Sequence, residues 1–380
     1  MAVRIAALGL LGALVAAPGL WLEHPWLTSL SIFGDWPRVA APWDRVILGL
    51  IGALALAVAV LPRRAALSGS LLALLLARGA WDLVLWQPYF LQYAFFLGVG
   101  AWCARRPDAL AGGVAALRFA MIGIYVWSGF SKLHLTFFED GLYTFWGPEW
   151  FDLALSVRRP MGFAAALIEL ALGLALIRPQ WRRWGRWGLL GMHVFLLVML
   201  GPLVRGFNPV VWPWNLAMIA LLLVLFRGEG ERFPARELVR WRGRPLTWVA
   251  MILFAVGPAL SYFGAWSTYL SFRLYAYRYD SGFIVALDED ARQALPPDVA
   301  AAFATEGVKG APYLDIFYWS EGEIGAFLPG DALAYRRVAE RILRATGGRG
   351  RLVFVLKAPP TIDSRERVQT EHPWVDGGWK

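Results

Sequence analysis

Residues 110–134 read LAGGVAALRFAMIGIYVWSGFSKLH, and this stretch is the clearest indication of the class of fold. Most of its side chains are apolar. As a helix it would rise about 37 Å, which is enough to cross the roughly 30 Å of hydrocarbon in a bilayer. The stretch therefore predicts a transmembrane helix.

Comparable apolar blocks recur along the first two thirds of the chain. The composition agrees, with 58% hydrophobic and 17% charged residues, where soluble domains have about 25% charged. The first block resembles a signal peptide, because Arg4 precedes it and Ala16 and Ala17 are small, but its length favours a retained anchor. The predicted spans are 3–22, 45–62, 66–86, 88–104, 110–134, 159–178, 186–203, 209–226 and 246–264.

The distribution of arginine predicts the orientation. With the N-terminus inside, the inner loops hold 15 arginines and the outer loops hold 5, as the positive-inside rule requires. The net charge of +9 comes from residues 1–264, which carry +10, whereas residues 265–380 carry −1. The basic excess is thus a topology signal and not a nucleic-acid surface. We expect a multi-pass protein of the inner (plasma) membrane with a cytoplasmic N-terminus.

The predicted fold is an all-α polytopic membrane bundle of about nine transmembrane helices (1–264), followed by a small α+β extracytoplasmic domain (265–380). In that domain, residues 268–287 are rich in aromatic and β-branched side chains and predict strands. Residues 331–346 predict a helix capped by Asp331, and 351–357 predict a strand. The last 20 residues are polar and predict a loose tail.

The sequence predicts no metal site. Cys103 is the only cysteine, which excludes an intramolecular disulfide and a cysteine-based zinc site. The acidic run 288–290 reads as a solvated turn in preference to a weak Ca²⁺ site. Motifs for nucleotide binding, zinc proteases and serine hydrolases are absent from the sequence.

Ionisable side chains inside the spans call for a structural or functional explanation, because placing them in a bilayer costs free energy. Arg78 and Asp82 are four residues apart and predict a structural ion pair. Arg118, Glu169 and His193 lie at depths of roughly 12, 14 and 10 Å from the inner ends of their spans. They predict either a buried polar network that holds the bundle together, or a proton relay or polar cavity floor.

A second polar group lies near the outer face, where span 110–134 ends and span 209–226 begins. Lys132 at this level either snorkels to water or sits in a dry pocket, where it can act as a base. Gly129 would let another backbone approach closely. The predicted catalytic residues are Lys132 and His134, and the predicted ligand-binding residues are Tyr125, Ser128, Asn208, Trp214 and Asn215.

Three motifs carry a family resemblance over roughly residues 110–345. Residues 124–133 (IYVWSGFSKL) resemble the Y-x-x-x-G-x-x-K-L helix of the HTTM superfamily, which includes vitamin K-dependent γ-glutamyl carboxylase. Residues 167–173 (LIELALG) are similar to DoxX/MauE-type proteins, and 208–215 (NPVVWPWN) resemble related bacterial membrane proteins.

The resemblance implies a quinone-linked site. In the carboxylase a membrane-embedded lysine deprotonates reduced vitamin K, and Lys132 matches that position by motif. The chain lacks the large lumenal region of the carboxylase. DoxX-type relatives are linked to quinone-coupled oxidation, often as accessory subunits. A quinone is thus the expected cofactor.

Three functions follow from this reading. The first is a quinone- or lipid-interacting membrane enzyme with its site near the outer leaflet. The second is a non-catalytic membrane subunit whose outer domain docks an extracytoplasmic protein partner. The third is a transporter, although inverted repeats and paired broken helices are not evident.

Overall fold

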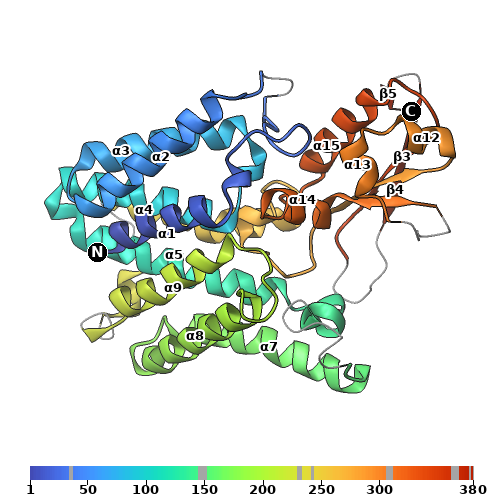
Figure 1. Ribbon diagram of the computed structural model, residues 1–380. Helices are drawn as coiled ribbons and strands as arrows, with labels where there is room; N and C mark the ends of the chain where they lie inside the picture. The colour runs from blue at the N-terminus through green and yellow to red at the C-terminus, as the bar shows by residue number, and fades with distance from the viewer. Residues whose placement is uncertain are drawn as a thin grey trace.

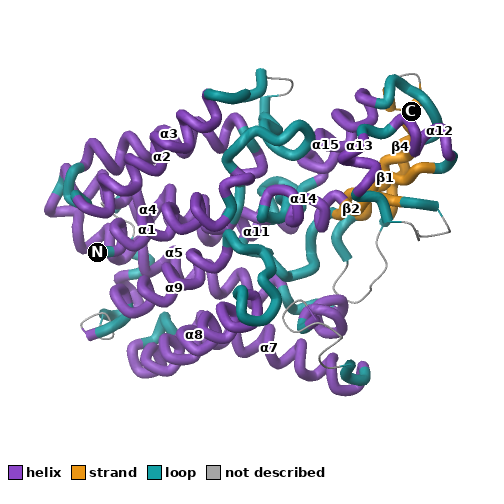
Figure 2. Tube along the Cα trace, in the orientation of Figure 1, coloured by secondary structure: helices purple, strands orange, loops and turns teal. Residues whose placement is uncertain are grey.

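The computed structural model describes residues 1–33, 37–143, 152–228, 233–240, 244–304, 311–360, 368–375 and 378–379. Helices make up the N-terminal two thirds of the chain, and a small sheet with its own helices follows (Figures 1 and 2). The N-terminus lies at one end of the helical part, and the sheet lies at the opposite end (Figure 1).

Each predicted span coincides with a helical segment. Proline occupies the first turn of α4, α8 and α10, where its missing N–H has no helical partner to lose. The segments are α1 (Ala2–Ala16), α2 (Trp43–Val60), α3 (Ala65–Trp81), α4 (Pro88–Arg105), α5 (Leu110–Ser131), α7 (Leu155–Ala175), α8 (Pro179–Leu200), α9 (Val211–Leu225), and α10 (Pro245–Met251) continued by η7 (Ile252–Val256) and α11 (Gly257–Leu260).

Length and hydropathy identify three of the described helices as able to cross a membrane. They are Trp43–Val60, Pro107–Ser131 and Pro245–Phe263. Ala2–Ala16, Ala65–Trp81 and Val211–Leu225 are apolar but shorter. The mostly helical architecture is thus confirmed, and the number of nine crossings stays a prediction.

The C-terminal sheet is antiparallel throughout, with the strand order β2-β1-β3-β4-β5. Its strands are β1 (Ser281–Ala286), β2 (Tyr313–Asp315), β3 (Leu352–Lys357), β4 (Gln369–Val375) and β5 (Gly378–Trp379). Helices α12 (Glu289–Ala294), α13 (Pro297–Ala301), α14 (Ile316–Ile324) and α15 (Ala332–Ala345) accompany it, and α15 packs on β1 and β3. The predicted helix and the strand at 351–357 are confirmed.

The strand prediction for 268–287 is right only for its last third. Residues Tyr269–Ser271 form a 3-10 turn, and Phe272, Tyr275 and Tyr277 adopt left-handed backbone angles that break any strand. The turns direct aromatic side chains into the helical part, where Phe272 stacks on Phe254 of η7 with ring centroids 5.6 Å apart. Burial against the helices therefore overrides the local β propensity.

The structure also corrects two smaller predictions for the C-terminal part. Of the predicted loose tail, Gln369–Val375 is β4, because its backbone pairs with β3 along its length; residues 361–367 lie outside the described part. Asp331 does occupy the N-cap position of α15, but its carboxylate does not cap the helix. It accepts hydrogen bonds from Ser267 and Thr268 instead, which ties α15 to the end of the last predicted span.

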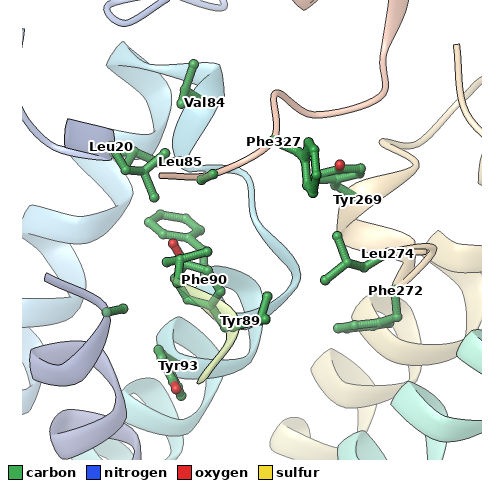
Figure 3. Close-up of a cluster of buried hydrophobic side chains, with 14 of the residues drawn as sticks. Leu20, Val84, Leu85, Tyr89, Phe90, Tyr93, Tyr269, Phe272, Leu274 and Phe327 are labelled. Carbon is green, nitrogen blue, oxygen red and sulfur yellow. The ribbon is translucent and has the colours of Figure 1, made fainter. Parts of the chain in front are cut away.

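An apolar contact joins the helical part to the C-terminal part. Figure 3 shows side chains of η2 (Leu83–Leu85) and α4 on one side, and side chains of the 269–274 turn on the other. All are buried. The facing residues are Leu85, Tyr89 and Phe90, and Tyr269, Phe272 and Leu274.

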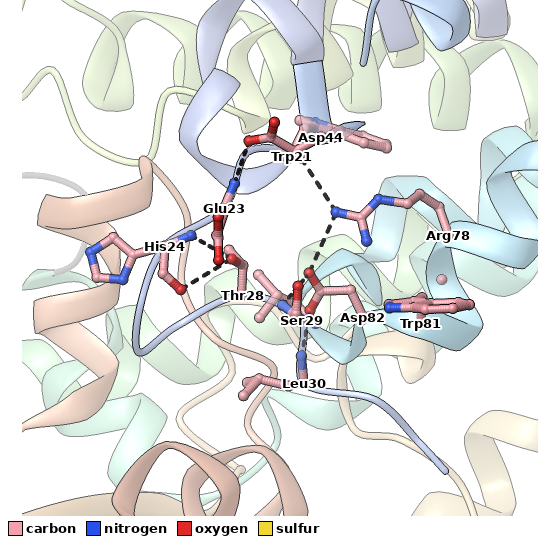
Figure 4. Close-up of polar contacts among 12 residues, drawn as sticks. Trp21, Glu23, His24, Thr28, Ser29, Leu30, Asp44, Arg78, Trp81 and Asp82 are labelled. Carbon is pink, nitrogen blue, oxygen red and sulfur yellow. Dashed lines mark hydrogen bonds and ion pairs between the residues drawn. The ribbon is translucent and has the colours of Figure 1, made fainter. Parts of the chain in front are cut away.

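Arg78 and Asp82 do more than pair with each other. Their side chains lie 3.7 Å apart, and the Asp82 carboxylate also accepts the backbone N–H groups of Ser29 at 2.7 Å and Leu30 at 3.2 Å (Figure 4). From the other side, Arg341 of α15 donates to the carbonyl of Ser29. The loop between α1 and α2 is thus held between the helical part and α15.

We expect Asp82→Ala to lower the free energy of unfolding by about 3 kcal/mol, because the buried Arg78 guanidinium loses its ion-pair partner and the N–H groups of Ser29, Leu30 and Val84 lose their acceptor. The matched control is Asp290→Ala, an exposed carboxylate, which should change stability by less than about 0.5 kcal/mol. Denaturation in detergent micelles measures both. Equal effects of the two substitutions would contradict the anchoring role of Asp82.

Candidate functional site

Glycines bring α5 and α7 unusually close together. A Cβ atom added to Gly129 would lie 2.5 Å from the backbone nitrogen of Leu170. A Cβ added to Gly173 would lie 2.9 Å from the Cβ of Tyr125. Only hydrogen fits at these two positions, so the glycine on each helix lets the other helix approach closely.

This close approach joins Lys132 to Glu169. The Lys132 ammonium lies 2.8 Å from Glu169 Oε2 and 2.7 Å from Ser128 Oγ. Lys132 is 7% exposed and Glu169 is 9% exposed, so the pair is shielded from water. Lys132 therefore does not snorkel to the surface, and its charge is balanced inside the bundle.

Arg118 does not join Glu169. Its Nε donates to the carbonyl of Leu225 at 2.8 Å, and its guanidinium lies over the ring of Phe233 at 4.2 Å. The sequence gives the depth of each residue in its span but not the direction in which it points around the helix. The structure consequently separates Arg118 from the Glu169 and His193 with which it was grouped.

His193 is held by partners on both ring nitrogens. Tyr125 Oη lies 2.8 Å from Nε2, and Asn215 Oδ1 lies 2.7 Å from Nδ1. Asn215 Nδ2 donates to the carbonyl of Val211, which orients the amide so that its oxygen faces the imidazole. His193 therefore carries its proton on Nδ1 and accepts the Tyr125 hydroxyl on Nε2.

These groups line one cavity of about 440 Å³ between α5, α7, α8, α9 and the 272–275 turn. Most of its wall is apolar. Its polar lining comes from Tyr125, Ser128, Lys132, Glu169, His193, Trp214, Asn215 and Tyr275.

The open side of the cavity lies between α7 and α8. Of its lining residues, Ile168 is 57% exposed and Phe195 is 43% exposed, and Gly191 is exposed as well. The exposed lining residues are thus apolar or glycine, so the rim of the cavity between these two helices is apolar.

Two predicted site residues lie behind the cavity wall. His134 is fully buried, and its Nε2 contacts the carbonyl of Ala276. Asn208 is 2% exposed, and its Nδ2 donates to Tyr275 Oη at 2.8 Å. Both hold the turn that closes the cavity.

The other five predicted site residues line the cavity itself. Trp214 also donates from its indole nitrogen to Gln92 Oε1 at 2.7 Å. Sequence reasoning missed Phe272 and Leu274 as lining residues, because the strand prediction placed them in the outer domain. The five that line the cavity are Tyr125, Ser128, Lys132, Trp214 and Asn215.

Residues 111–211 match the family model of methylamine utilisation protein MauE. With the apolar helices, this match supports a membrane protein. The assignment to the HTTM superfamily, its carboxylase branch and DoxX is wrong, because this is the family model that matches and those families give no match. The MauE-like segment covers just over a quarter of the chain. No curated protein and no solved structure matches the chain.

The MauE-like segment supplies most of the residues that line the cavity. It begins in α5 and ends at the start of α9, so it contains both partners of the Lys132–Glu169 pair together with Tyr125 and His193. Asn215 and the 272–275 turn lie outside it. The matched range contains both the motif 167–173 and the motif around Lys132, and the matching family is MauE and not the HTTM superfamily.

We expect Gly129→Ala to lower the free energy of unfolding by about 1–3 kcal/mol, because the new methyl group meets the backbone of α7. Gly49→Ala is the matched control, since Gly49 also lies within a helix and nothing lies within 4 Å of its Cβ position. Thermal unfolding in detergent measures both variants. Tolerance of alanine at both positions would show that α5 and α7 are not held by this contact.

Lys132→Met and Glu169→Met should each lower the free energy of unfolding by about 3–5 kcal/mol, because each leaves one buried charge unpaired. The double variant should lose far less than the sum of the two. The exposed pair Arg292–Glu289, at 3.5 Å, is the control cycle and should show coupling of less than about 1 kcal/mol. Additive losses at Lys132 and Glu169 would refute the ion pair.

Proposed function

We propose that this membrane protein binds a neutral, membrane-soluble molecule whose polar head carries hydroxyl or carbonyl oxygens. A quinone or its quinol has this chemistry. The site is the cavity between α5, α7, α8 and α9. The observation that carries the proposal is a largely apolar cavity whose rim between α7 and α8 exposes apolar side chains.

The walls favour an apolar body that enters from lipid. Ligand pockets commonly have volumes of about 300–1,000 Å³ and a few placed polar groups on apolar walls. The cavity of about 440 Å³ fits a ring-sized head with part of a tail. Its exposed rim residues, Ile168 and Phe195, offer no charge to a water-soluble ligand.

The polar groups favour a neutral head. The Lys132 and Glu169 charges balance each other, so an ionic ligand would leave one charge unmatched. Lys132 contacts Glu169 through Oε2, which leaves Oε1 to accept a hydrogen bond from a hydroxyl group. Ser128 Oγ accepts from Lys132, which leaves its own hydrogen to donate to a carbonyl group.

The likeness to MauE supports placing this function in the helical part. The matched segment supplies α5, α7 and α8, and with them the polar groups that would meet the ligand head. Binding thus belongs to the MauE-like segment, and the 272–275 turn completes the wall.

The test uses decylubiquinone and its quinol with the purified protein in detergent, and binding is measured by the rise in unfolding temperature with ligand concentration. We expect saturable stabilisation. Gly191→Trp should weaken binding at least tenfold, because Gly191 lines the cavity and has open space at its Cβ position. Gly49→Trp on α2, which also has open space, is the control and should bind normally.

Decane tests the role of the head. It should not stabilise the protein at concentrations where the quinone does, since it offers nothing to Glu169 or Ser128. Unchanged binding by Gly191→Trp, or equal stabilisation by decane, would rule out this site.

A further inference from the structure

A second, larger cavity lies where the helical part meets the C-terminal part. Its volume is about 1070 Å³, and it shares no lining residue with the first. One wall is apolar and comes from the ends of α3 and α4 with η2, including Leu76, Leu83, Phe90 and Leu91. The opposite wall is polar and comes from residues 261–273 and the start of α15.

Arg273 is the unusual group in the polar wall. Its side chain is 2% exposed, and its guanidinium lies 3.8 Å from the ring centre of Tyr262. A guanidinium has five N–H donors. Among the described residues, the only acceptor that Arg273 reaches is the hydroxyl of Ser261, and no carboxylate lies within ion-pair distance. Its Nε is enclosed and finds no acceptor in the part of the chain that the structure describes.

Neighbouring groups share this shortage of acceptors. Tyr262 Oη and Trp266 Nε1 belong to the same cavity wall, and neither has a hydrogen-bond partner among the described residues. The guanidinium of Arg278 lies 4.7 Å from the same Tyr262 ring but does not line the cavity, and it brings no acceptor to Arg273.

The acidic residues of the wall are already engaged. Asp331 accepts from Ser267 and Thr268, and Asp280 accepts the backbone N–H of Ala332. Neither reaches Arg273 closely enough to form an ion pair. The wall of the cavity therefore carries a positive charge with no carboxylate partner among the described residues, and an acceptor-rich anion would balance it.

Burial of an unpaired charge is costly, and this cost shows in the lowered pKa of Arg273, which desolvation brings to about 10. The side chain still carries its charge at neutral pH. A phosphate or carboxylate would supply the missing acceptors, as arginine forks do elsewhere.

We propose that this cavity binds an anionic amphiphile, with a phosphate or carboxylate head on Arg273 and an apolar tail along α3 and α4. The volume exceeds that of ordinary small-molecule pockets, about 300–1,000 Å³, and suits a lipid. Leu76 is 53% exposed and Ile32 is 37% exposed, so the apolar end of the cavity reaches the protein surface beside α3. A bilayer lipid with a net negative head is the source that this arrangement fits.

The test compares phosphatidylglycerol, phosphatidylcholine and inorganic phosphate as additives to the purified full-length chain in neutral detergent. We expect phosphatidylglycerol to raise the unfolding midpoint by roughly 5 °C more than phosphatidylcholine does. Inorganic phosphate alone should have no such effect. Native mass spectrometry should detect retained phosphatidylglycerol.

Two substitutions and a control separate binding from structure. Arg273→Gln should abolish the phosphatidylglycerol shift without lowering the midpoint in neutral detergent, because it removes an uncompensated charge. Arg278→Gln should keep the shift, since Arg278 does not line the cavity. Ala80→Trp should also abolish the shift, because it fills the apolar side and leaves Arg273 in place.

Three outcomes would overturn the proposal. One is a full phosphatidylglycerol shift in Arg273→Gln or Ala80→Trp. Another is a lower midpoint of Arg273→Gln in neutral detergent, which would make Arg273 a structural residue. The last is an equal shift with inorganic phosphate, which would leave a free-anion site and no lipid.

Discussion

The close contact of α5 with α7 is the constraint on which the first cavity depends. Gly129 and Gly173 let the two backbones meet, and that approach brings the ammonium of Lys132 within 2.8 Å of Glu169. Either charge alone would be costly at such burial, because little of it is exposed for hydration and the interior screens charges poorly. The ion pair therefore locks the helices at the distance that the glycines allow, and it gives the cavity its polar side.

The C-terminal part completes the helical part and does not merely follow it. The turn around residues 269–277 supplies Phe272 to a stack with Phe254, and Tyr275 to the wall of the first cavity. Arg341 of α15 holds the loop between α1 and α2 from the opposite side to Asp82. The C-terminal part therefore closes the first cavity, because residues of its turn form part of the cavity wall.

The two cavities differ in whether their buried charges are paired, and this difference determines the charge of the ligand head that each one favours. In the first, Lys132 and Glu169 neutralise each other, and the uncommitted groups are one carboxylate oxygen and one hydroxyl hydrogen. In the second, Arg273 is buried without a carboxylate partner among the described residues, and its neighbours are donors as well. A neutral head suits the first and an anionic head suits the second.

The sequence predicts the positions of the helices, because an apolar block of transmembrane length indicates a helix from its composition alone. It also identified Lys132, Tyr125 and Asn215 as residues worth explaining, since polar groups in such blocks need a partner. The packing of the folded chain is what pairs Glu169 with Lys132 and places Arg118 over Phe233, and it turns residues 269–277 inward in place of a strand. The reason is physical: depth along a helix follows from counting residues, but the partner across a helix contact depends on which faces meet, and that is set by packing among segments far apart in the chain.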